Sequence, residues 1–151
     1  MWRGAKPPHT YRHEPTLDTE GLRYSPRHNK WSRIPAPTTE SGEDISLGGG
    51  AACTLTDGRI AATGGVNKDV FLAALRDQSA DYLQHPAEWY RFNGRVLVFD
   101  PRAGEWSVAA ECPECARAGA AIAADDDGGF YLTGGEVKPR IRTAETIHIK
   151  P

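Results

Sequence analysis

Hydrophobic residues along the chain fall mostly in short runs that end at glycine, proline or asparagine. Such runs are typical of β-strands bounded by turns rather than of long helices. The first pair of strands is expected within residues 21–35, as a strand that ends at Tyr24, a turn on Ser25-Pro26, and a return strand that begins at Trp31. The following residues, 35–44, are expected to form a loop.

Two Asp-Gly dipeptides each predict a further hairpin. A strand of small residues within 48–55 leads to Asp57-Gly58, and a second strand over 59–63 ends at Gly64-Gly65. Asp-Gly between two apolar runs is a strong hairpin signal, because its backbone conformation suits a two-residue turn. Strands of small residues are typical of places where backbones pass close to one another.

The same order of elements then appears a second time. Segments 95–108, 117–123 and 130–135 repeat the patterns of 22–34, 48–55 and 60–65. The offsets agree, being 75 for Tyr24 with Phe99 and for Trp31 with Trp106, and 70 for Asp57 with Asp127 and for Gly65 with Gly135. An internal repeat of this kind predicts a repeated β-sheet unit. Its tryptophan is expected to pack as a large apolar plate between neighbouring sheets.

One segment between the repeats has a helical pattern instead. Apolar residues at Val70, Leu72, Ala74 and Leu75 suit a short helix within 67–77. Its N-terminus is expected to be capped by Asn67 or Asp69.

The repeated unit resembles the kelch repeat, which is the blade of a β-propeller. The predicted fold class is therefore all-β, with about two to two and a half kelch-type blades and a short helical insertion near 69–77. The predicted divisions are a poorly ordered arm over 1–20, a first blade over 21–66, an insertion over 67–93, a second blade over 94–137 and a final strand over 143–150.

Charge and composition limit the classes of partner that the chain is expected to bind. A net charge of -2 and a pI near 6.2 provide no basic surface for nucleic acid or for an anionic membrane. No apolar run approaches the roughly 20 residues needed to cross a bilayer. The N-terminal segment has no apolar stretch after its basic residues, so it is not expected to act as a secretory signal. The chain as written is expected to be soluble and not exported.

The chain has three cysteines, an odd number, which argues against a framework of disulfides. Cys112 and Cys115 have the C-x-x-C spacing of half a zinc site or of a redox pair. A zinc site needs four ligands, and no second pair of ligands stands at suitable spacing. A thioredoxin-type pair would begin a helix after a buried strand, whereas this one is expected in a loop. Incidental loop cysteines are therefore the favoured interpretation, and no cofactor or metal is predicted.

Three segments carry a resemblance to a known family. Residues 64–72, 82–93 and 134–143 resemble the cyclically permuted mutarotase family, kelch propellers that include the sialic acid (N-acetylneuraminate) mutarotases. The likeness extends roughly from residue 21 to the C-terminus, and the run Gly-Glu-x-Lys-Pro-x-x-Arg-Thr over 135–143 is its most specific part. Arg140 departs from the pattern, because a glycine is expected there.

The resemblance implies a propeller of about six blades, of which this chain is similar to the C-terminal half only. An isolated half would leave sheet edges uncovered. Three explanations stay open: a truncated product, self-association of halves, or a separate N-terminal half that completes the ring. Family members are typically exported, so the compartment would be periplasmic if the parent protein carries a signal.

The resemblance also assigns roles to residues. Glu136 and Arg142 match the proposed catalytic pair, with the carboxylate transferring protons and the arginine binding the carboxylate of a sialic acid or related sugar acid. Lys138 would raise the local positive potential and help to bind substrate. Weaker substrate-binding candidates follow from position in the chain and not from the resemblance: Arg117 opens a small-residue strand, and His85, Glu88 and Tyr90 lie on the insertion. The alternative for the pair is a salt-bridged turn without catalytic function.

The expected activity is a sialic acid mutarotase-like isomerase that interconverts the α and β anomers. A non-catalytic kelch module that binds glycans or proteins is the competing class, and an inactive truncated propeller is a third possibility. The acidic run over 125–127 could suggest a cation site, but the glycine after it favours a hairpin tip.

Overall fold

The computed structural model describes residues 14–151. Its strands are β1 (Gly21–Ser25), β2 (Lys30–Ile34), β3 (Ala51–Thr54), β4 (Ile60–Thr63), β5 (Arg95–Asp100), β6 (Glu105–Glu111), β7 (Ala121–Ala124), β8 (Phe130–Thr133), β9 (Glu136–Lys138), β10 (Ile141–Arg142) and β11 (Thr146–Ile149). One α-helix, α1 (Lys68–Asp77), and three short 3₁₀ helices, η1 (Tyr82–Gln84), η2 (Ala87–Tyr90) and η3 (Pro113–Cys115), lie between them.

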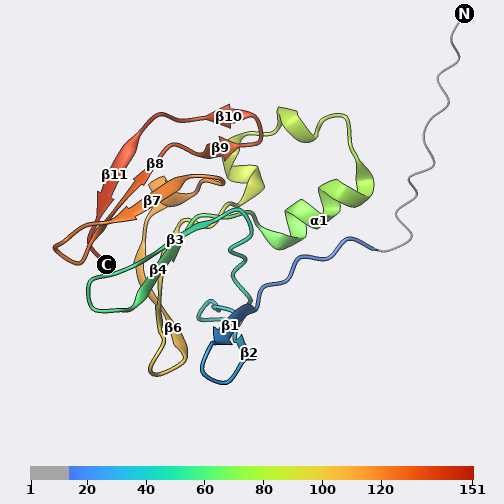
Figure 1. The fold of residues 1–151 in the computed structure, drawn as a ribbon. Helices are drawn as coiled ribbons and strands as arrows, with labels where there is room; N and C mark the ends of the chain where they lie inside the picture. Colours follow the sequence, from blue (N-terminus) through green and yellow to red (C-terminus); the bar gives the residue numbers. More distant parts are fainter. Residues whose placement is uncertain (1–13) are drawn as a thin grey trace, which may run out of the picture.

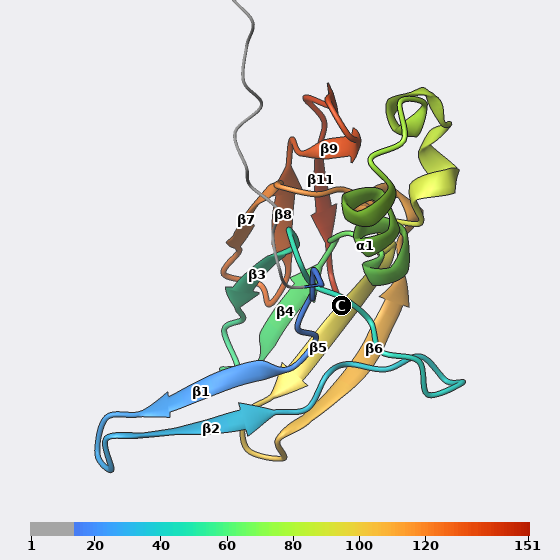
Figure 2. The ribbon, with the colours of Figure 1, turned by 90° about the vertical axis from the view of Figure 1, so that its right-hand side faces the viewer.

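Among the described residues, all the strand pairs are antiparallel and fall into four sheets. The largest is four-stranded, in the order β3-β4-β5-β6, and beside it lies a three-stranded sheet in the order β11-β8-β7 (Figure 1). Their first strands, β3 and β7, lie against each other. The β1–β2 hairpin extends away from both sheets (Figure 2), and β9 with β10 forms a small hairpin near the insertion. The all-β prediction is confirmed.

The core lies between the two larger sheets. Its buried members come from strands of both sheets, from the residue that follows β3 and from η3, and are Leu55, Ala61, Val96, Cys115, Phe130 and Leu132. These side chains alternate with exposed ones along β8, as expected for a strand that buries one face. Val96, Leu97, Val98 and Phe99 of β5 are all buried, because this strand has a neighbour on each edge and is covered on both faces.

The sheets do not begin where the predicted blades begin. The predicted blade over 21–66 would join β1 and β2 to β3 and β4, yet β4 pairs with β5 across the whole insertion. Ala61 lies opposite Val98, for example, although 37 residues separate them in the chain (98 − 61). The sequence repeat is therefore real, but each hydrogen-bonded sheet starts half a repeat later. β4 pairs with β5 because β5 is a buried strand. The period of the sequence repeat does not indicate which strands pair.

The insertion starts with the predicted helix. The Asn67 side chain accepts a hydrogen bond of 3.1 Å from the backbone N–H of Val70, so Asn67 is the N-cap. The helix ends at Gln78, which takes a left-handed backbone conformation with φ of 47°. After it, an aromatic cluster fills η1 and η2: Tyr82, His85, Trp89 and Tyr90 pack edge-on or stacked. No helix within residues 14–151 is long and apolar enough to span a membrane.

The predicted arm is only partly within the described residues. Residues 1–13 lie outside them. From residue 14 onward the segment is held by specific contacts: Glu14 pairs with Arg76 at 2.8 Å, and Thr19 donates to Asp44 at 2.8 Å. This part of the segment therefore contacts the rest of the molecule, and the poorly ordered arm stays a prediction.

The two repeated tryptophans have different environments. Trp106 packs on Phe99 and donates its ring N–H to the carbonyl of Pro35 at 2.9 Å, which connects β6 with the chain that leaves β2. Trp31, its counterpart, is 67% exposed and contacts Tyr24 of its own hairpin. The prediction that this side chain packs between sheets is wrong for Trp31, because β1 and β2 have no further strand beside them among the described residues.

The tip between β7 and β8 is fastened by Asp125, as the hairpin interpretation of the acidic run predicts. Its carboxylate accepts backbone N–H groups of Asp127 and Gly129 at 2.9 and 2.7 Å and contacts the ring of His148 on β11. The hydrogen bond with His148, followed by those with the backbone, lowers the pKa of Asp125 below its usual value of 3.8.

Because the folded-state pKa of Asp125 is lowered, its stabilising effect is present above about pH 3.8 and is lost as the pH falls through the folded value. We expect Asp125→Asn to lower the melting temperature by a few degrees at neutral pH and to remove part of the acid-induced loss of stability. Thermal unfolding followed by circular dichroism from neutral to acidic pH checks this. The exposed neighbour Asp126 supplies the control Asp126→Asn, which should behave like the wild type. Equal pH profiles for the two variants would contradict the assignment.

Candidate functional site

The conspicuous charged loop of the sequence is the β9–β10 hairpin. Glu136 begins β9, Arg142 ends β10, and the two are direct cross-strand partners. The turn between them passes through Pro139 and Arg140, and Arg140 has a φ of 67°. That is the left-handed region in which glycine is most favourable, so the arginine there is accommodated at a cost in backbone strain. The departure noted at Arg140 thus leaves the turn in the conformation that a glycine would adopt.

Glu136 and Arg142 lie within ion-pair distance. An Arg142 guanidinium nitrogen (Nη2) is 3.4 Å from Glu136 Oε1, and the other carboxylate oxygen accepts the backbone N–H of Arg140 at 3.4 Å. The Arg142 side chain is 74% exposed and that of Glu136 29% exposed. The pair is therefore accessible from solvent, and its long ion pair contributes little to stability. A carboxylate beside a solvent-exposed guanidinium can move a proton while the guanidinium binds an anionic group on the same ligand.

The backbone of Glu136 is held more firmly than its side chain. Its N–H donates to the carbonyl of Ala118 at 2.7 Å, and its carbonyl accepts the N–H of Ala118 at 2.9 Å. This reciprocal bridge joins the hairpin to the segment that leads into β7. Glu136 is thus fixed at its Cα by the protein, with its carboxylate directed by the hairpin alone.

Lys138 connects the hairpin to the insertion. Its ammonium group donates to the carbonyl of His85 at 2.6 Å and to that of Leu83 at 3.4 Å. These acceptors belong to the protein backbone, so this geometry gives Lys138 a positioning role. Because β9 also lies against η2, the aromatic cluster of the insertion stands beside the Glu136–Arg142 hairpin.

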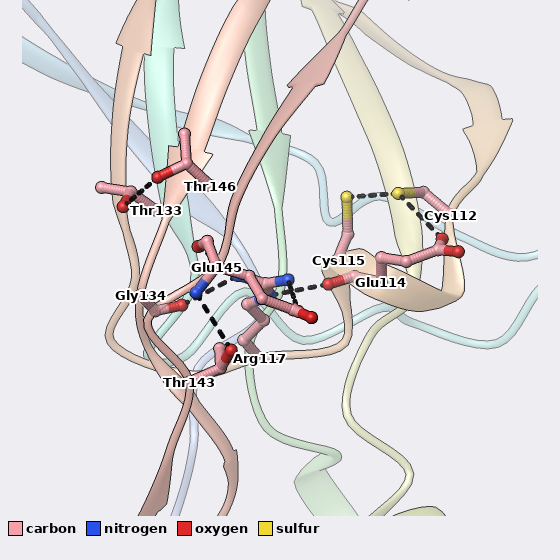
Figure 3. Close-up of polar contacts among 9 residues, drawn as sticks. All are labelled: Cys112, Glu114, Cys115, Arg117, Thr133, Gly134, Thr143, Glu145 and Thr146. Carbon is pink, nitrogen blue, oxygen red and sulfur yellow. Dashed lines mark hydrogen bonds and ion pairs between the residues drawn. The ribbon is translucent and has the colours of Figure 1, made fainter.

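Arg117 is placed differently from the prediction. Its side chain is only 1% exposed, and every nitrogen of its guanidinium donates to the protein (Figure 3). Nε binds the carbonyl of Glu114 at 2.7 Å, Nη1 binds the carbonyls of Gly134 and Glu145 at 3.2 and 3.1 Å, and Nη2 binds the Glu145 carboxylate at 3.2 Å. A sugar acid cannot reach this group, so the substrate-binding role predicted for Arg117 is replaced by a structural one.

Of the remaining candidates for substrate binding, one is buried and two are accessible from solvent. Tyr90 is completely buried and its hydroxyl donates to the carbonyl of Tyr82, so it too is a packing residue, contrary to the prediction. His85 is half-buried and stacks on Trp89 with ring centroids 3.8 Å apart. Glu88 is exposed, and its carbonyl accepts the N–H of Arg91 at the end of η2. Binding roles for His85 and Glu88 stay predictions.

A surface hollow of about 480 Å³ lies elsewhere, between the loop at Thr39–Ser46 and the start of α1, where Asn67, Asp69 and Arg91 face it. None of the predicted site residues lines it. Within residues 14–151 no group of three or more His, Cys, Asp or Glu side chains is arranged to hold a metal ion.

Two features escaped the sequence interpretation. Glu145 is the charge partner of the buried Arg117, and nothing in the sequence marks it because 28 residues separate the two. Cys112 and Cys115, which we interpreted as incidental, have their sulfur atoms 2.6 Å apart. Their C-x-x-C spacing was the signal, and η3 supplies the turn that brings them together.

Comparison with known proteins identifies what the chain is similar to. The family model for N-acetylneuraminate epimerase matches residues 8–150. An N-acetylneuraminate epimerase of Brucella melitensis is 33% identical over 142 residues, covering 84% of this chain and 35% of the relative. Its counterpart in Escherichia coli K12 is 32% identical over 136 residues, covering 80% and 34%. The solved structure of YjhT superposes with a TM-score of 0.66 at 28% identity, covering 87% of this chain and 43% of that chain. The fold is therefore that of a partial β-propeller, and the chain spans about a third of the length of these curated relatives.

The buried guanidinium leads to a stability prediction. Arg117→Lys keeps the charge but leaves several carbonyl acceptors without a donor, so we expect a loss of about 3 kcal/mol in the free energy of unfolding. Urea denaturation measures it. The control is Arg102→Lys, at an exposed turn position, with an expected change of less than about 0.5 kcal/mol. If the two variants were equally stable, the four hydrogen bonds of Arg117 would not support the fold.

The contacts of Lys138 lead to a second prediction about stability. Lys138→Gln removes the link to the insertion, and we expect faster amide hydrogen exchange in 136–142 with a stability loss of about 1 kcal/mol. Arg140→Gln, an exposed change on the same hairpin, should leave exchange at Glu136 unchanged. A normal exchange pattern in Lys138→Gln would refute the positioning role.

Proposed function

Because the chain belongs to the N-acetylneuraminate epimerase family, we propose that it acts as a sialic acid mutarotase, interconverting the α and β anomers of N-acetylneuraminate. In this proposal the chain contributes bacterial kelch-type blades to an enzyme of carbohydrate metabolism. The observation that supports it is the pairing of Glu136 with Arg142 on an accessible hairpin within the most specific stretch of the resemblance.

The proposed reaction opens and recloses the sugar's hemiketal. Glu136, as a carboxylate, accepts the proton of the anomeric hydroxyl while a water molecule donates a proton to the ring oxygen, and the bond between that oxygen and the anomeric carbon breaks. Rotation of the freed carbonyl and the reverse proton transfers give the other anomer. Arg142 binds the substrate carboxylate through a two-point hydrogen bond and holds the anomeric carbon near Glu136. Atoms are conserved in the reaction, and no redox step is involved.

The local architecture suits these roles. The reciprocal hydrogen bonds with Ala118 fix the Cα of Glu136, while its side chain is held only by contacts that a ligand can exchange for its own. Lys138 anchors the hairpin to the aromatic cluster of the insertion, and the exposed guanidinium of Arg142 lies beside the carboxylate. We propose His85 and Glu88, which adjoin this hairpin through η2, as secondary contacts to the sugar.

A binding module is the second candidate. It is favoured by the openness of the hairpin, where the Arg142 side chain is 74% exposed and that of Glu136 is 29% exposed. Kelch propellers serve many functions, and fold does not establish turnover. An arginine that captures a sugar acid needs no proton transfer from Glu136. The two candidates therefore differ in the role of the carboxylate.

Proton NMR of freshly released α-N-acetylneuraminate, followed as it relaxes to the β form, tests the proposal. We expect the 151-residue chain to accelerate relaxation above the spontaneous rate. Glu136→Gln should lower the catalysed rate by about 100-fold or more while ligand binding stays measurable. Arg142→Lys should weaken binding by about tenfold, because a lysine cannot make the two-point contact. Light scattering on the same samples fixes the assembly state.

The control is Arg140→Gln, which alters charge in the same turn without touching either role. A fully active Glu136→Gln variant would exclude the carboxylate as the proton carrier. Binding without any acceleration, by a folded species of defined size, would replace the mutarotase by the binding module.

A further inference from the structure

Cys112 and Cys115 form a close pair of thiols. Their sulfur atoms are 2.6 Å apart, with the Cys115 thiol donating to the Cys112 sulfur (Figure 3). Both are free thiols in this structure. Cys115 is buried in the core between the two larger sheets, whereas Cys112 is partly exposed. One sulfur of the pair is therefore accessible to a small molecule from solvent and the other is shielded.

The fold holds this pair in place through the backbone. The N–H of Cys112 donates to the carbonyl of Gly94 at 2.7 Å, which fixes the start of the turn against the strand-entry segment of β5. The N–H of Cys115 donates to the carbonyl of Cys112 at 2.8 Å and closes the turn of η3. Tertiary contacts thus add to the local C-x-x-C spacing in bringing the sulfurs together.

The pair is connected to the candidate site by a short stretch of chain. Two residues after Cys115 comes Arg117, whose guanidinium binds the carbonyls of Gly134 and Glu145. The next residue, Ala118, makes both hydrogen bonds to the backbone of Glu136. Whatever fixes the segment from Cys112 to Ala118 therefore also fixes the Cα of Glu136.

We propose that Cys112 and Cys115 are a reversible disulfide site that exchanges with a small-molecule disulfide such as oxidised glutathione. The Cys112 thiolate attacks one sulfur of that disulfide, which forms a mixed disulfide and releases the first small thiolate. Cys115 passes its proton to solvent and attacks the Cys112 sulfur, which releases the second. Two protein thiols are oxidised to one disulfide while the small disulfide is reduced to two thiols.

Cys112 attacks before Cys115 because the Cys115 sulfur is buried and the Cys112 sulfur is partly exposed. Desolvation, together with the hydrogen bond to Cys112, raises the pKa of Cys115 to about 12, so its thiolate is scarce before the mixed disulfide forms. Cys112 is the sulfur that a dissolved disulfide can approach. The closed disulfide ties the two ends of η3 together and restrains the segment that supports Arg117 and Ala118. This inference does not depend on the sialic acid activity.

Equilibration of the folded chain with graded mixtures of reduced and oxidised glutathione tests the proposal. After an acid quench and alkylation, mass spectrometry should find Cys112 and Cys115 linked to each other and Cys53 alkylated. We expect the equilibrium constant for the internal disulfide to be about tenfold greater in the folded chain than in urea, because the fold preorganises the sulfurs. Cys115→Ser should trap the glutathione adduct on Cys112. The control Cys53→Ser should leave the equilibrium unchanged.

A folded-state constant equal to or below the urea value would overturn the proposal, as would a persistent glutathione adduct on the wild-type chain. The link to Glu136 has its own readout. Amide hydrogen exchange at Ala118 and Glu136 should be slower in the oxidised chain than in the reduced chain. Equal exchange in the two forms would overturn the link and confine the disulfide to its own turn.

Discussion

The guanidinium of Arg117 is the interaction on which the candidate site depends. A buried charge is costly unless the protein supplies acceptors for its donors, and here they come from three separate segments, at Glu114, Gly134 and Glu145. Two of these segments lead into and out of the β9–β10 hairpin. The arginine therefore draws the hairpin's base onto the turn after β6, and Ala118 beside it fixes Glu136. A hydrophobic residue at this position could fill the space but could not define the register of those loops.

In the resulting site, hydrogen bonds hold the base of the β9–β10 hairpin, and its outer end is exposed to solvent. Glu136 is fixed at its backbone, Lys138 ties the middle of the hairpin to the insertion, and Arg142 projects into solvent. Such an arrangement suits ligand capture, because the Arg142 side chain can adjust to an anion while the backbone of Glu136 stays at a defined place. The aromatic cluster around Tyr90 gives the insertion the rigidity that this anchoring needs.

Local signals in the sequence predicted local structure well. Asp-Gly turns, the Asn67 cap and the acidic tip at Asp125 were each read from adjacent residues, and each is confirmed because its partners lie within a few positions. Sheet membership was read wrongly, since the partner of β4 is selected by burial of β5 beyond the insertion. Arg117 and Tyr90 were misassigned for a related reason: a polar side chain in sequence carries no mark of whether its acceptors are the protein's own carbonyls.

The half-repeat shift between sequence unit and sheet has a consequence for dissecting the molecule. A cut placed at a repeat boundary, near residue 66, would part β4 from β5 inside one hydrogen-bonded sheet. A cut in the loop between β2 and β3 would leave the pairing of β1 to β11 intact, because β1 and β2 pair only with each other and the loop holds just the isolated bridge between Thr38 and Asp44. A module that begins at β3 therefore keeps the four-stranded sheet whole, and the sequence repeat is a misleading guide to where this protein can be divided.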